Sequence, residues 1–186
     1  MSTAAPLDTI GAVDGRRFRD VLGRFCTGIV VVTSVDEEAG QPVGFACQSF
    51  SALSLEPPLV LFCPARTSRT WPVIARTGRF AVNVLTHAQQ PVSARFGGRE
   101  PDKFAGSGWR PGALGMPLLD GVAAWLECAV ETVHEAGDHY IVVGRVAGLD
   151  DGEADPPLLF HRGKYTVTTP DPAGAPTTWP ETDAWL

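Results

Sequence analysis

The residues from Val43 to Phe62, VGFACQSFSALSLEPPLVLF, combine hydroxyl and amide side chains with almost no charge. Small residues let backbone N–H groups come close to a flat ring, and here they are Gly44, Ala46 and Cys47. Uncharged polar side chains suit a polyol chain and the hydrogen-bonding edge of such a ring. These side chains are Gln48, Ser49 and Ser51. The combination is typical of a site for a flavin, which is an amphipathic ring with a ribityl tail.

A second stretch, ARTSRTW, gathers groups that bind phosphate just before a predicted short helix. The groups are Arg66, Thr67, Ser68, Arg69 and Thr70. A helix N-terminus with hydroxyls and guanidinium groups favours an anion. Ser/Thr clusters between strands are also common as turns and helix caps. The pattern alone therefore leaves both interpretations open, flavin or nucleotide binding and a purely structural turn.

Several reaction classes lack the motifs that they need. The chain has no GxGxxG after a strand, no GxxxxGK[ST], no HExxH and no GxSxG, and its four histidines are not spaced as a metal cluster. A net charge of −6 argues against nucleic acid or an anionic membrane as a partner. The protein is therefore either a binding module or an enzyme whose reactive part is a bound cofactor.

The cysteines and the apolar runs indicate the cellular setting. No run reaches the roughly 18 apolar residues of a membrane helix, and the first 15 residues lack the features of a signal peptide. The cysteines show neither CxxC nor zinc spacing, and each lies within or beside an apolar segment. They are Cys26, Cys47, Cys63 and Cys128. We expect a cytoplasmic protein with buried free thiols and no metal.

The elements that would position these groups are mainly β-strands. Runs that are β-branched or aromatic span 28–35, 43–50, 58–63, 79–85, 122–135 and 138–149, with a hairpin turn at 136–138. Helical spacing begins at Asp14, Ser68 and His87, and a last apolar segment covers 157–168. The helices are too few for the crossovers of a parallel sheet, so we predict an all-β antiparallel barrel with peripheral helices. The expected domain is 14–169, between tails at 1–13 and 170–186.

Six blocks carry a family resemblance, and together they span Phe18 to Tyr165. They are FRDVLGRFCTGIVVVT, GFACQSFSALSLEPPLVLFC, SRTWPVIARTGRFAVNVL, SARFGGREPDKF, GDHYIVVGRV and PLLFHRGKY. In this order they resemble the flavin reductase domain family, the small NAD(P)H:flavin reductase components of two-component aromatic monooxygenases. The resemblance implies an antiparallel FMN-binding split β-barrel, a homodimer, and flavin sites at or near the dimer interface.

The resemblance also implies roles for particular residues. The isoalloxazine and ribityl would be held by Pro42, Val43, Gly44, Phe45, Ala46, Gln48 and Ser49. The flavin phosphate would be held by the segment from Cys63 and Pro64 through Arg66 and Thr67 to Ser68 and Arg69. Arg95 and Phe96 would lie near the flavin phosphate or the adenylate of FAD. The alternative for Arg95 is an ion pair with a carboxylate. His139 would lie near the nicotinamide, unless it is an exposed turn residue, and Tyr165 near the pocket.

The predicted activity follows from the cofactors and not from a catalytic side chain. Hydride transfer between two stacked rings needs positioning and no strong protein acid or base. We therefore expect an NAD(P)H-dependent flavin reductase that supplies reduced FMN or FAD to a separate monooxygenase. The closest resemblance is to reductases of phenol-hydroxylating oxygenases in steroid-ring degradation. FMN or FAD, and NADH or NADPH, stay open. So do two alternatives, a flavin-binding redox protein or sensor without turnover and a split-barrel oxidase that uses pyridoxamine phosphate.

Overall fold

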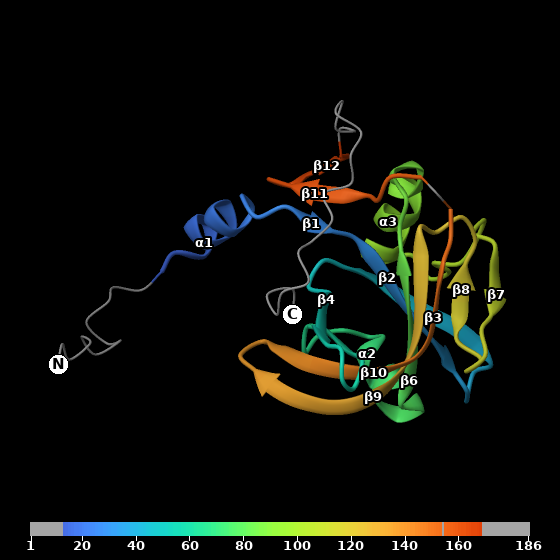
Figure 1. The fold of residues 1–186 in the computed structure, drawn as a ribbon. Helices are drawn as coiled ribbons and strands as arrows, with labels where there is room; N and C mark the ends of the chain where they lie inside the picture. The colour runs from blue at the N-terminus through green and yellow to red at the C-terminus, as the bar shows by residue number, and fades with distance from the viewer. Residues whose placement is uncertain (1–12, 154, 169–186) are drawn as a thin grey trace.

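The computed structural model describes residues 13–153 and 155–168, in which antiparallel β-sheets carry a few peripheral helices (Figure 1). The predicted tails lie outside these residues, except for Val13. The helices are α1 (Gly15–Leu22), α2 (Trp71–Thr77), the 3-10 helix η2 (His87–Gln89) and α3 (Gln90–Gly97). The first six strands are β1 (Thr27–Gly28), β2 (Val30–Asp36), β3 (Gln41–Cys47), β4 (Ser51–Ser54), β5 (Leu59–Phe62) and β6 (Arg79–Val84). The others are β7 (Trp109–Pro111), β8 (Pro117–Leu119), β9 (Ala124–Ala136), β10 (His139–Asp151), β11 (Leu159–His161) and β12 (Lys164–Thr166).

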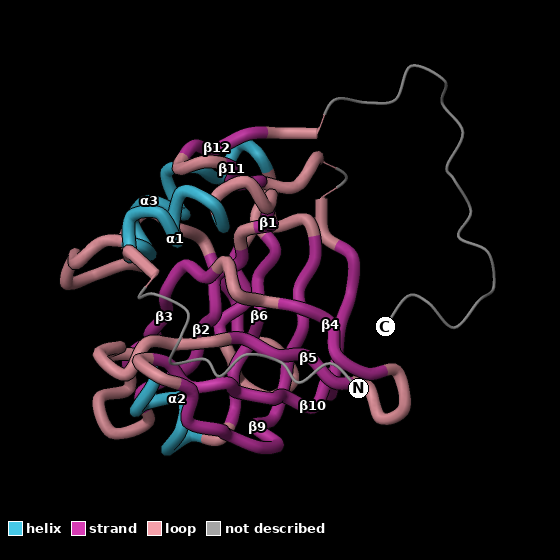
Figure 2. Tube along the Cα trace, turned by 90° about the vertical axis from the view of Figure 1, so that its left-hand side faces the viewer, coloured by secondary structure: helices cyan, strands magenta, loops and turns pink. Residues whose placement is uncertain are grey.

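The main sheet has seven strands in the order β3-β2-β6-β9-β10-β5-β4, and every neighbouring pair is antiparallel. β3 and β4 form its two edges, so the hydrogen bonds between the described strands do not close a barrel. Two small sheets, β1-β11-β12 and β7-β8, complete the fold. Figures 1 and 2 show β11, β12 and α3 at one end of the main sheet and α2 at the other. The expectation of an antiparallel β protein with peripheral helices is therefore confirmed.

β2 lies between the edge strand β3 and β6, and the protein has a core on each of its faces. Val30 and Val32 pack with the aromatic side chains of Phe62, Phe80 and Trp71, and the rings of Phe62 and Phe80 lie 5.0 Å apart. The intervening Val31 packs on the other face, in the core that lies under α3. Because successive side chains of a strand point to opposite faces, a run of valines can serve both cores. This explains the unbroken apolar sequence of this strand.

Local sequence signals place most element ends. The Asp14 side chain accepts the backbone N–H of Arg17 at 3.0 Å and so caps α1. α2 ends at Gly78, whose φ of +67° is readily adopted only by glycine. The β9–β10 hairpin turns at Gly137, with φ +61°, and pairs Ala136 with His139. The predicted hairpin is confirmed.

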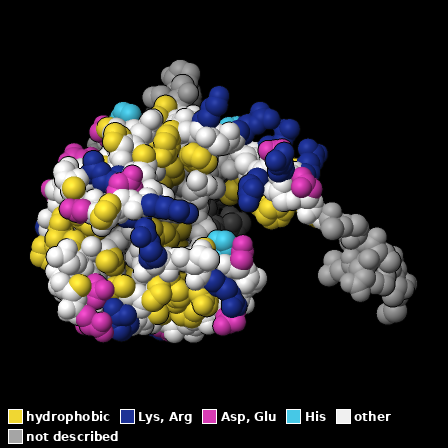
Figure 3. Space-filling view, turned by 180° about the vertical axis from the view of Figure 1, so that it is seen from behind, with side chains coloured by type: hydrophobic (Ala, Val, Ile, Leu, Met, Phe, Trp, Pro, Cys, Tyr) yellow, Lys and Arg dark blue, Asp and Glu magenta, His cyan; other side chains and the backbone are white. Residues whose placement is uncertain are grey.

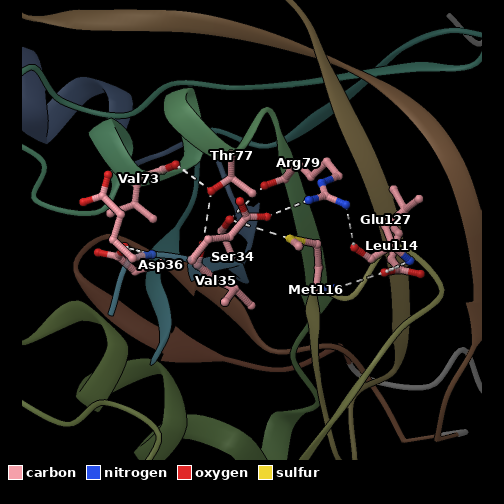
Figure 4. Close-up of polar contacts among 11 residues, drawn as sticks. Ser34, Val35, Asp36, Val73, Thr77, Arg79, Leu114, Met116 and Glu127 are labelled. Atoms are coloured by element: carbon pink, nitrogen blue, oxygen red, sulfur yellow. Dashed lines mark hydrogen bonds and ion pairs between the residues drawn. The ribbon is translucent and has the colours of Figure 1, made fainter. Parts of the chain in front are cut away.

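Buried polar groups join α2 and the loop before β8 to the main sheet (Figure 4). Thr77 donates to the carbonyl oxygens of Val35 and Val73, at 3.1 and 2.9 Å. Across the sheet, the carboxylate of Glu127 accepts the backbone N–H groups of Ala113 and Leu114 at 2.7 and 2.9 Å. Glu127 is 1% exposed, and such a buried carboxylate is tolerated only when it is hydrogen-bonded. This network holds the loop between β7 and β8, whose Met116 is also buried in the core, against β9.

Three differences from the sequence-based expectations concern exposure and short strands. The sequence did not predict β4, β7 or β8, because each has only three or four residues and depends on its partner strand. Cys26 is exposed and Cys63 is half-buried, so the expectation of buried thiols is right for only Cys47 and Cys128, although all four are free. The amphipathic helix α1 forms as predicted, but it buries no residue in this chain and projects from the sheets (Figure 1).

Candidate functional site

The two faces of β3 divide the residues predicted to hold the flavin ring. Phe45 and Cys47 point into the core that contains Phe62. Gly44 and Ala46 face α3, and a Cβ atom at Gly44 would lie 2.8 Å from the Phe96 ring and 3.0 Å from the Val32 carbonyl oxygen. Glycine is thus required where strand and helix meet. Phe45 and Cys47 can contribute to a ring site only through their backbone.

Ser49 connects the end of β3 to the segment after β5. Its hydroxyl accepts the amide N–H of Cys63 at 2.9 Å and lies 3.2 Å from the Cys63 carbonyl oxygen. The Ser49 hydroxyl oxygen also lies 3.3 Å from the sulfur of Cys47. Burial raises the pKa of the Cys47 thiol, so it stays protonated and inert at neutral pH. The structure thus joins the predicted ring loop to the predicted phosphate segment.

The phosphate segment is in turn paired with the β9–β10 hairpin. Ala65 forms a β-bridge with His139, and the amide of Tyr140 donates to the Pro64 carbonyl oxygen at 2.9 Å. The His139 ring nitrogen Nδ1 lies 2.8 Å from the Asp138 carboxylate, and this contact lowers the pKa of Asp138. His139 is therefore an exposed residue of the turn, as one interpretation had it. It also stands beside the predicted phosphate segment, and its place near the nicotinamide stays a prediction.

Arg66 is engaged by the same hairpin. Its guanidinium lies 2.7 Å from Glu135 and 5.4 Å from the centre of the Tyr140 ring. Both charged side chains are exposed, so this ion pair is weak and exchangeable. In this structure Arg66 supports the hairpin and does not point at an open cavity.

A cavity of about 410 Å³ lies beside β3 and carries two cations. It is lined by Asp36, Ala39, Gln41, Pro42, Val43, Gly44, Arg69, Thr70 and residues 100–104. The pKa of Lys103 is lowered by burial and by the nearby charge of Arg69, while Glu100 opposes the shift. Its ammonium donates to the Phe96 carbonyl oxygen at 2.7 Å. Two cations held this close favour an anion between them.

Sequence reasoning missed Lys103. It lies in the block SARFGGREPDKF, but it is more than thirty residues away from Arg69, and only the fold brings the two together. One local signal for Lys103 was its neighbour Phe104, because an aromatic residue in a loop indicates that the loop packs on the core. The Phe104 ring does pack against Phe96, with ring centres 5.0 Å apart. A basic residue beside a buried aromatic pair is held in a defined place.

The hydroxyls of the phosphate segment act mainly as caps. The hydroxyl of Ser68 accepts the backbone N–H of Trp71 at 3.1 Å, at the beginning of α2. Thr70 donates to the Gly44 carbonyl oxygen at 3.4 Å and so ties α2 to β3. Thr67 is exposed. The structural interpretation of Ser68 is therefore realised in this chain, while Arg69 next to it lines the cavity.

Arg95 and Phe96 support the site from α3. Arg95 donates to the Ala105 carbonyl oxygen and lies 3.2 Å from the Ser107 hydroxyl, so it does not pair with a carboxylate in the described part of the chain. Phe96 is fully buried behind Gly44. Neither side chain presents a free surface to an adenylate here.

Gln48 and Tyr165 meet on the opposite side of β3. Tyr165 donates to the Ser93 hydroxyl at 3.2 Å and, with Gln48, lines a cavity of about 280 Å³. Gln48 and Ser49 also line a larger, mainly apolar cavity of about 630 Å³ that reaches α1 and Phe160. Ser51 lies on the edge strand β4, and its hydroxyl donates only to the Ala52 carbonyl oxygen. The structure thus groups Tyr165 with Gln48 and leaves Ser51 apart.

Comparison with protein families decides the assignment of the chain. Residues 22–169 match the family described as flavin reductase like domain. The chain belongs to this family. The flavin-dependent monooxygenase reductase subunit HsaB of Rhodococcus jostii is 57% identical over 160 residues, which are 86% of this chain and 81% of that protein. The predicted family and the predicted activity class, a flavin reductase of a two-component monooxygenase, are confirmed.

Solved structures of the flavin reductase family have the same fold. Nitrilotriacetate monooxygenase component B from Mycobacterium thermoresistibile superposes with a TM-score of 0.84 at 55% identity, covering 89% of this chain and 92% of that one. The NADH:FAD oxidoreductase SgcE6 of Streptomyces globisporus, solved with NAD and FAD fragments, has a TM-score of 0.81 at 34% identity and covers 86% and 95%. Flavin and NADH are therefore the cofactors expected for this chain's family.

The donor set beside β3 fits a flavin phosphate. Arg69 and Lys103 supply positive charge to this cavity, and the carboxylates of Asp36, Glu100 and Asp102 line it as well. Burial and the charge of Arg69 lower the pKa of Lys103. The ring edge needs hydrogen-bonding groups without charge, and Gln48 and Ser49 provide them on two neighbouring cavities. The residues of this flavin reductase thus suit both ends of an FMN moiety.

No helix in the part of the chain that is described is long and apolar enough to cross a membrane.

Proposed function

We propose that this flavin reductase binds its flavin with the ring near Gln48 and Ser49 and the phosphate between Arg69 and Lys103, and that His139 receives the nicotinamide donor. One observation carries the proposal. The Ser49 hydroxyl is bonded to Cys63, and the segment that follows Cys63 is paired with His139. The three groups therefore belong to one continuous surface, although ninety residues separate Ser49 from His139 in the sequence.

The chemistry asks the protein mainly to hold two rings. A bound flavin accepts a hydride from the reduced nicotinamide, and the protein need not supply an acid or a base. Ser49 positions the loop against Cys63, and the small residues Gly44 and Ala46 let β3 pack closely on α3. The Nδ1 of His139 donates to the Asp138 carboxylate at 2.8 Å, which leaves Nε2 to accept a hydrogen bond from the carboxamide N–H of the donor. Rate enhancement then comes from positioning, which can be a large share of the barrier.

The cation pair gives a direct test with two flavins. Arg69→Ala is expected to raise the KM for FMN about tenfold, since a charge-assisted hydrogen bond contributes roughly 1.5 kcal/mol or more. The KM for riboflavin, which has no phosphate, should not change. Arg145→Ala is the matched control, because Arg145 pairs with Glu131 and neither residue lines the cavity. An equal rise in the KM for FMN and for riboflavin would mean that Arg69 does not bind the flavin phosphate.

The quaternary structure and the barrel are part of the same proposal. We infer a split barrel completed in a homodimer, with α1 packing on the second copy. The apolar side chains of Phe18, Val21, Leu22 and Phe25 support this, because they are 45–77% exposed in a single chain. Sedimentation equilibrium would show a dimer, and Phe18→Ser with Leu22→Ser should shift it to monomer. A monomeric wild-type protein would contradict the inference.

The acceptor of the reduced flavin is a separate oxygenase. The HsaB relative is named as the reductase subunit of a flavin-dependent monooxygenase. We propose the same division of labour here, in the cytoplasm, with transfer by diffusion and with a phenolic substrate, steroid-derived in the nearest subgroup, that belongs to the oxygenase. Oxygenase turnover that continues when the two proteins are separated by a dialysis membrane would support diffusion.

Anaerobic mixing tests the activity. The protein is mixed with NADH or NADPH and excess FMN or FAD, and the flavin absorbance near 450 nm is followed. We expect bleaching of many equivalents of flavin per protein, and the four combinations rank both cofactors. Bleaching limited to one equivalent would instead identify a redox carrier. Bound flavin without bleaching would contradict the enzyme.

A further inference from the structure

Four arginines gather in a second cavity, at the end of the molecule from which α1 projects. The cavity has a volume of about 480 Å³ and is lined by Arg17, Arg19, Asp20, Gly23, Arg24, Arg162 and Gly163. Figure 3 shows the blue Lys and Arg side chains gathered at this end. We call it the arginine cavity. It is a strongly cationic site in a protein whose net charge is −6.

The arginine cavity lacks the carboxylates that usually neutralise such a cluster. Asp20 is the one acidic residue in its lining, against four guanidinium groups. Among the residues that the structure describes, none of these four arginines forms an ion pair, whereas Arg66, Arg76, Arg79 and Arg145 all do. All four arginines are exposed, so solvent screens their mutual repulsion, and their guanidinium groups can donate charge-assisted hydrogen bonds to an anion with several charges.

The cavity is built by two segments that are fixed to each other. The amide of Arg162, in the turn between β11 and β12, donates to the Gly23 carbonyl oxygen at 2.8 Å. Arg162 has a φ of +52°, which is uncommon for a residue other than glycine. The turn therefore holds an arginine in a conformation that glycine would adopt more easily. The hydrogen bond from Arg162 to Gly23 places this arginine beside the end of α1.

The arginine cavity continues into the apolar cavity that Gln48 and Ser49 line. Arg19, Gly23, Arg162 and Gly163 line both. One end of this continuous groove carries the groups assigned above to the flavin ring, and the other end carries only cations. The flavin phosphate already has its own cations, Arg69 and Lys103, in a different cavity. The arginine cavity is thus left for the anionic part of the other reactant.

We propose that Arg17, Arg19, Arg24 and Arg162 bind the diphosphate of the pyridine dinucleotide that donates the hydride. The proposal rests on the proposed function, because it takes the ring site at Gln48 and Ser49 as given. A guanidinium fork matches the oxygens of a diphosphate in a bidentate way, and two forks can grip both phosphates. The apolar side chain of Phe160, which lines the neighbouring apolar cavity, suits a flat ring of the same molecule.

A binding measurement tests the site without turnover. Calorimetric titration of the full chain with inorganic pyrophosphate, at low salt and with saturating FMN to occupy the proposed site at Arg69 and Lys103, should show one site per chain. Arg19→Ala combined with Arg162→Ala should weaken it at least tenfold, and Arg162→Lys should keep part of the affinity. Arg16→Ala is the matched control, since Arg16 lies on α1 but does not line the cavity. Pyrophosphate binding that is equal in all variants would overturn the proposal even if the enzyme reduces flavin normally.

A kinetic comparison identifies the ligand. For the Arg19/Arg162 double variant the KM for NADH should rise about tenfold with kcat nearly unchanged. The KM for reduced nicotinamide mononucleotide, which has no diphosphate, and those for FMN and FAD should stay as in the wild type. A change confined to FAD would assign the arginines to the flavin and overturn the proposal. A wild-type protein that binds pyrophosphate but reduces no flavin would instead refute the proposed function alone.

Discussion

The hydroxyl of Ser49 lies 2.9 Å from the amide nitrogen of Cys63 and accepts its hydrogen bond. Ser49→Ala removes this link and frees two segments that jointly form the proposed ring site. We expect a loss of about 1 kcal/mol in the free energy of unfolding and about a fivefold rise in the KM for flavin. Ser51→Ala, on β4, is the matched control, because its hydroxyl bonds only to the neighbouring carbonyl. Equal flavin kinetics in both variants would show that the link does not position the flavin.

Lys103 predicts a pH dependence of flavin binding. Its pKa is lowered from 10.5, first by burial and then by Arg69, so it loses its proton at a lower pH than an ordinary lysine. Since only the ammonium attracts phosphate, FMN affinity should fall as the pH rises through this lowered pKa. The free energy of unfolding of the ligand-free protein should change in the opposite direction, rising between the lowered pKa and 10.5, because the unfolded chain then holds more protons.

The measurement for Lys103 is the dissociation constant of FMN between pH 7 and 10, by flavin fluorescence. Lys103→Met should bind FMN more weakly at pH 7 and should lose the alkaline decline. Riboflavin gives the control within the same protein, since it lacks the phosphate. A decline of the same size with riboflavin would assign the titration to another group.

Gly44 tests the packing of β3 on α3. A Cβ atom there would lie 2.8 Å from the Phe96 ring and 3.0 Å from the backbone oxygen of Val32, and the backbone cannot yield. Gly44→Ala should therefore cost about 1–3 kcal/mol of stability, seen as a lower melting temperature in calorimetry. Combining it with Phe96→Leu should recover only the part due to the ring. An unchanged melting temperature for Gly44→Ala would mean that the strand shifts freely.

His139 separates binding of the donor from the chemical step. His139→Ala should raise the KM for NADH several-fold while kcat stays within a factor of about two, because the histidine orients the donor and transfers no proton. Steady-state kinetics with saturating flavin give both constants. A collapse of kcat with unchanged NADH binding would refute the positioning role. Asp138→Asn should have a smaller effect in the same direction, since Asn can still hold the ring nitrogen at Nδ1.

Local patterns in the sequence were sufficient for most elements. Alternating or continuous β-branched runs, the cap at Asp14, the glycine after α2 and the turn at Gly137 are signals that act over a few residues. The polar stretches at 43–62 and 65–71, together with the family resemblance, located the predicted ring loop and phosphate segment. The sequence patterns did not predict β4, β7 and β8, because strands of three or four residues form only when a partner strand is present.

The strand patterns and the family resemblance of the sequence by themselves determined a β-rich flavin reductase. Only the tertiary structure decided which groups meet. It placed Lys103 beside Arg69 and paired Arg66 with Glu135. It also set Phe45 and Gly44 on opposite faces of β3. It also joined Arg162 to the end of α1. The reason is that such contacts join residues 34 positions apart for Arg69 and Lys103, 69 for Arg66 and Glu135, and 139 for Gly23 and Arg162. Their geometry is set by strand order and by which face of a strand each side chain occupies, and neither leaves a local trace in the sequence.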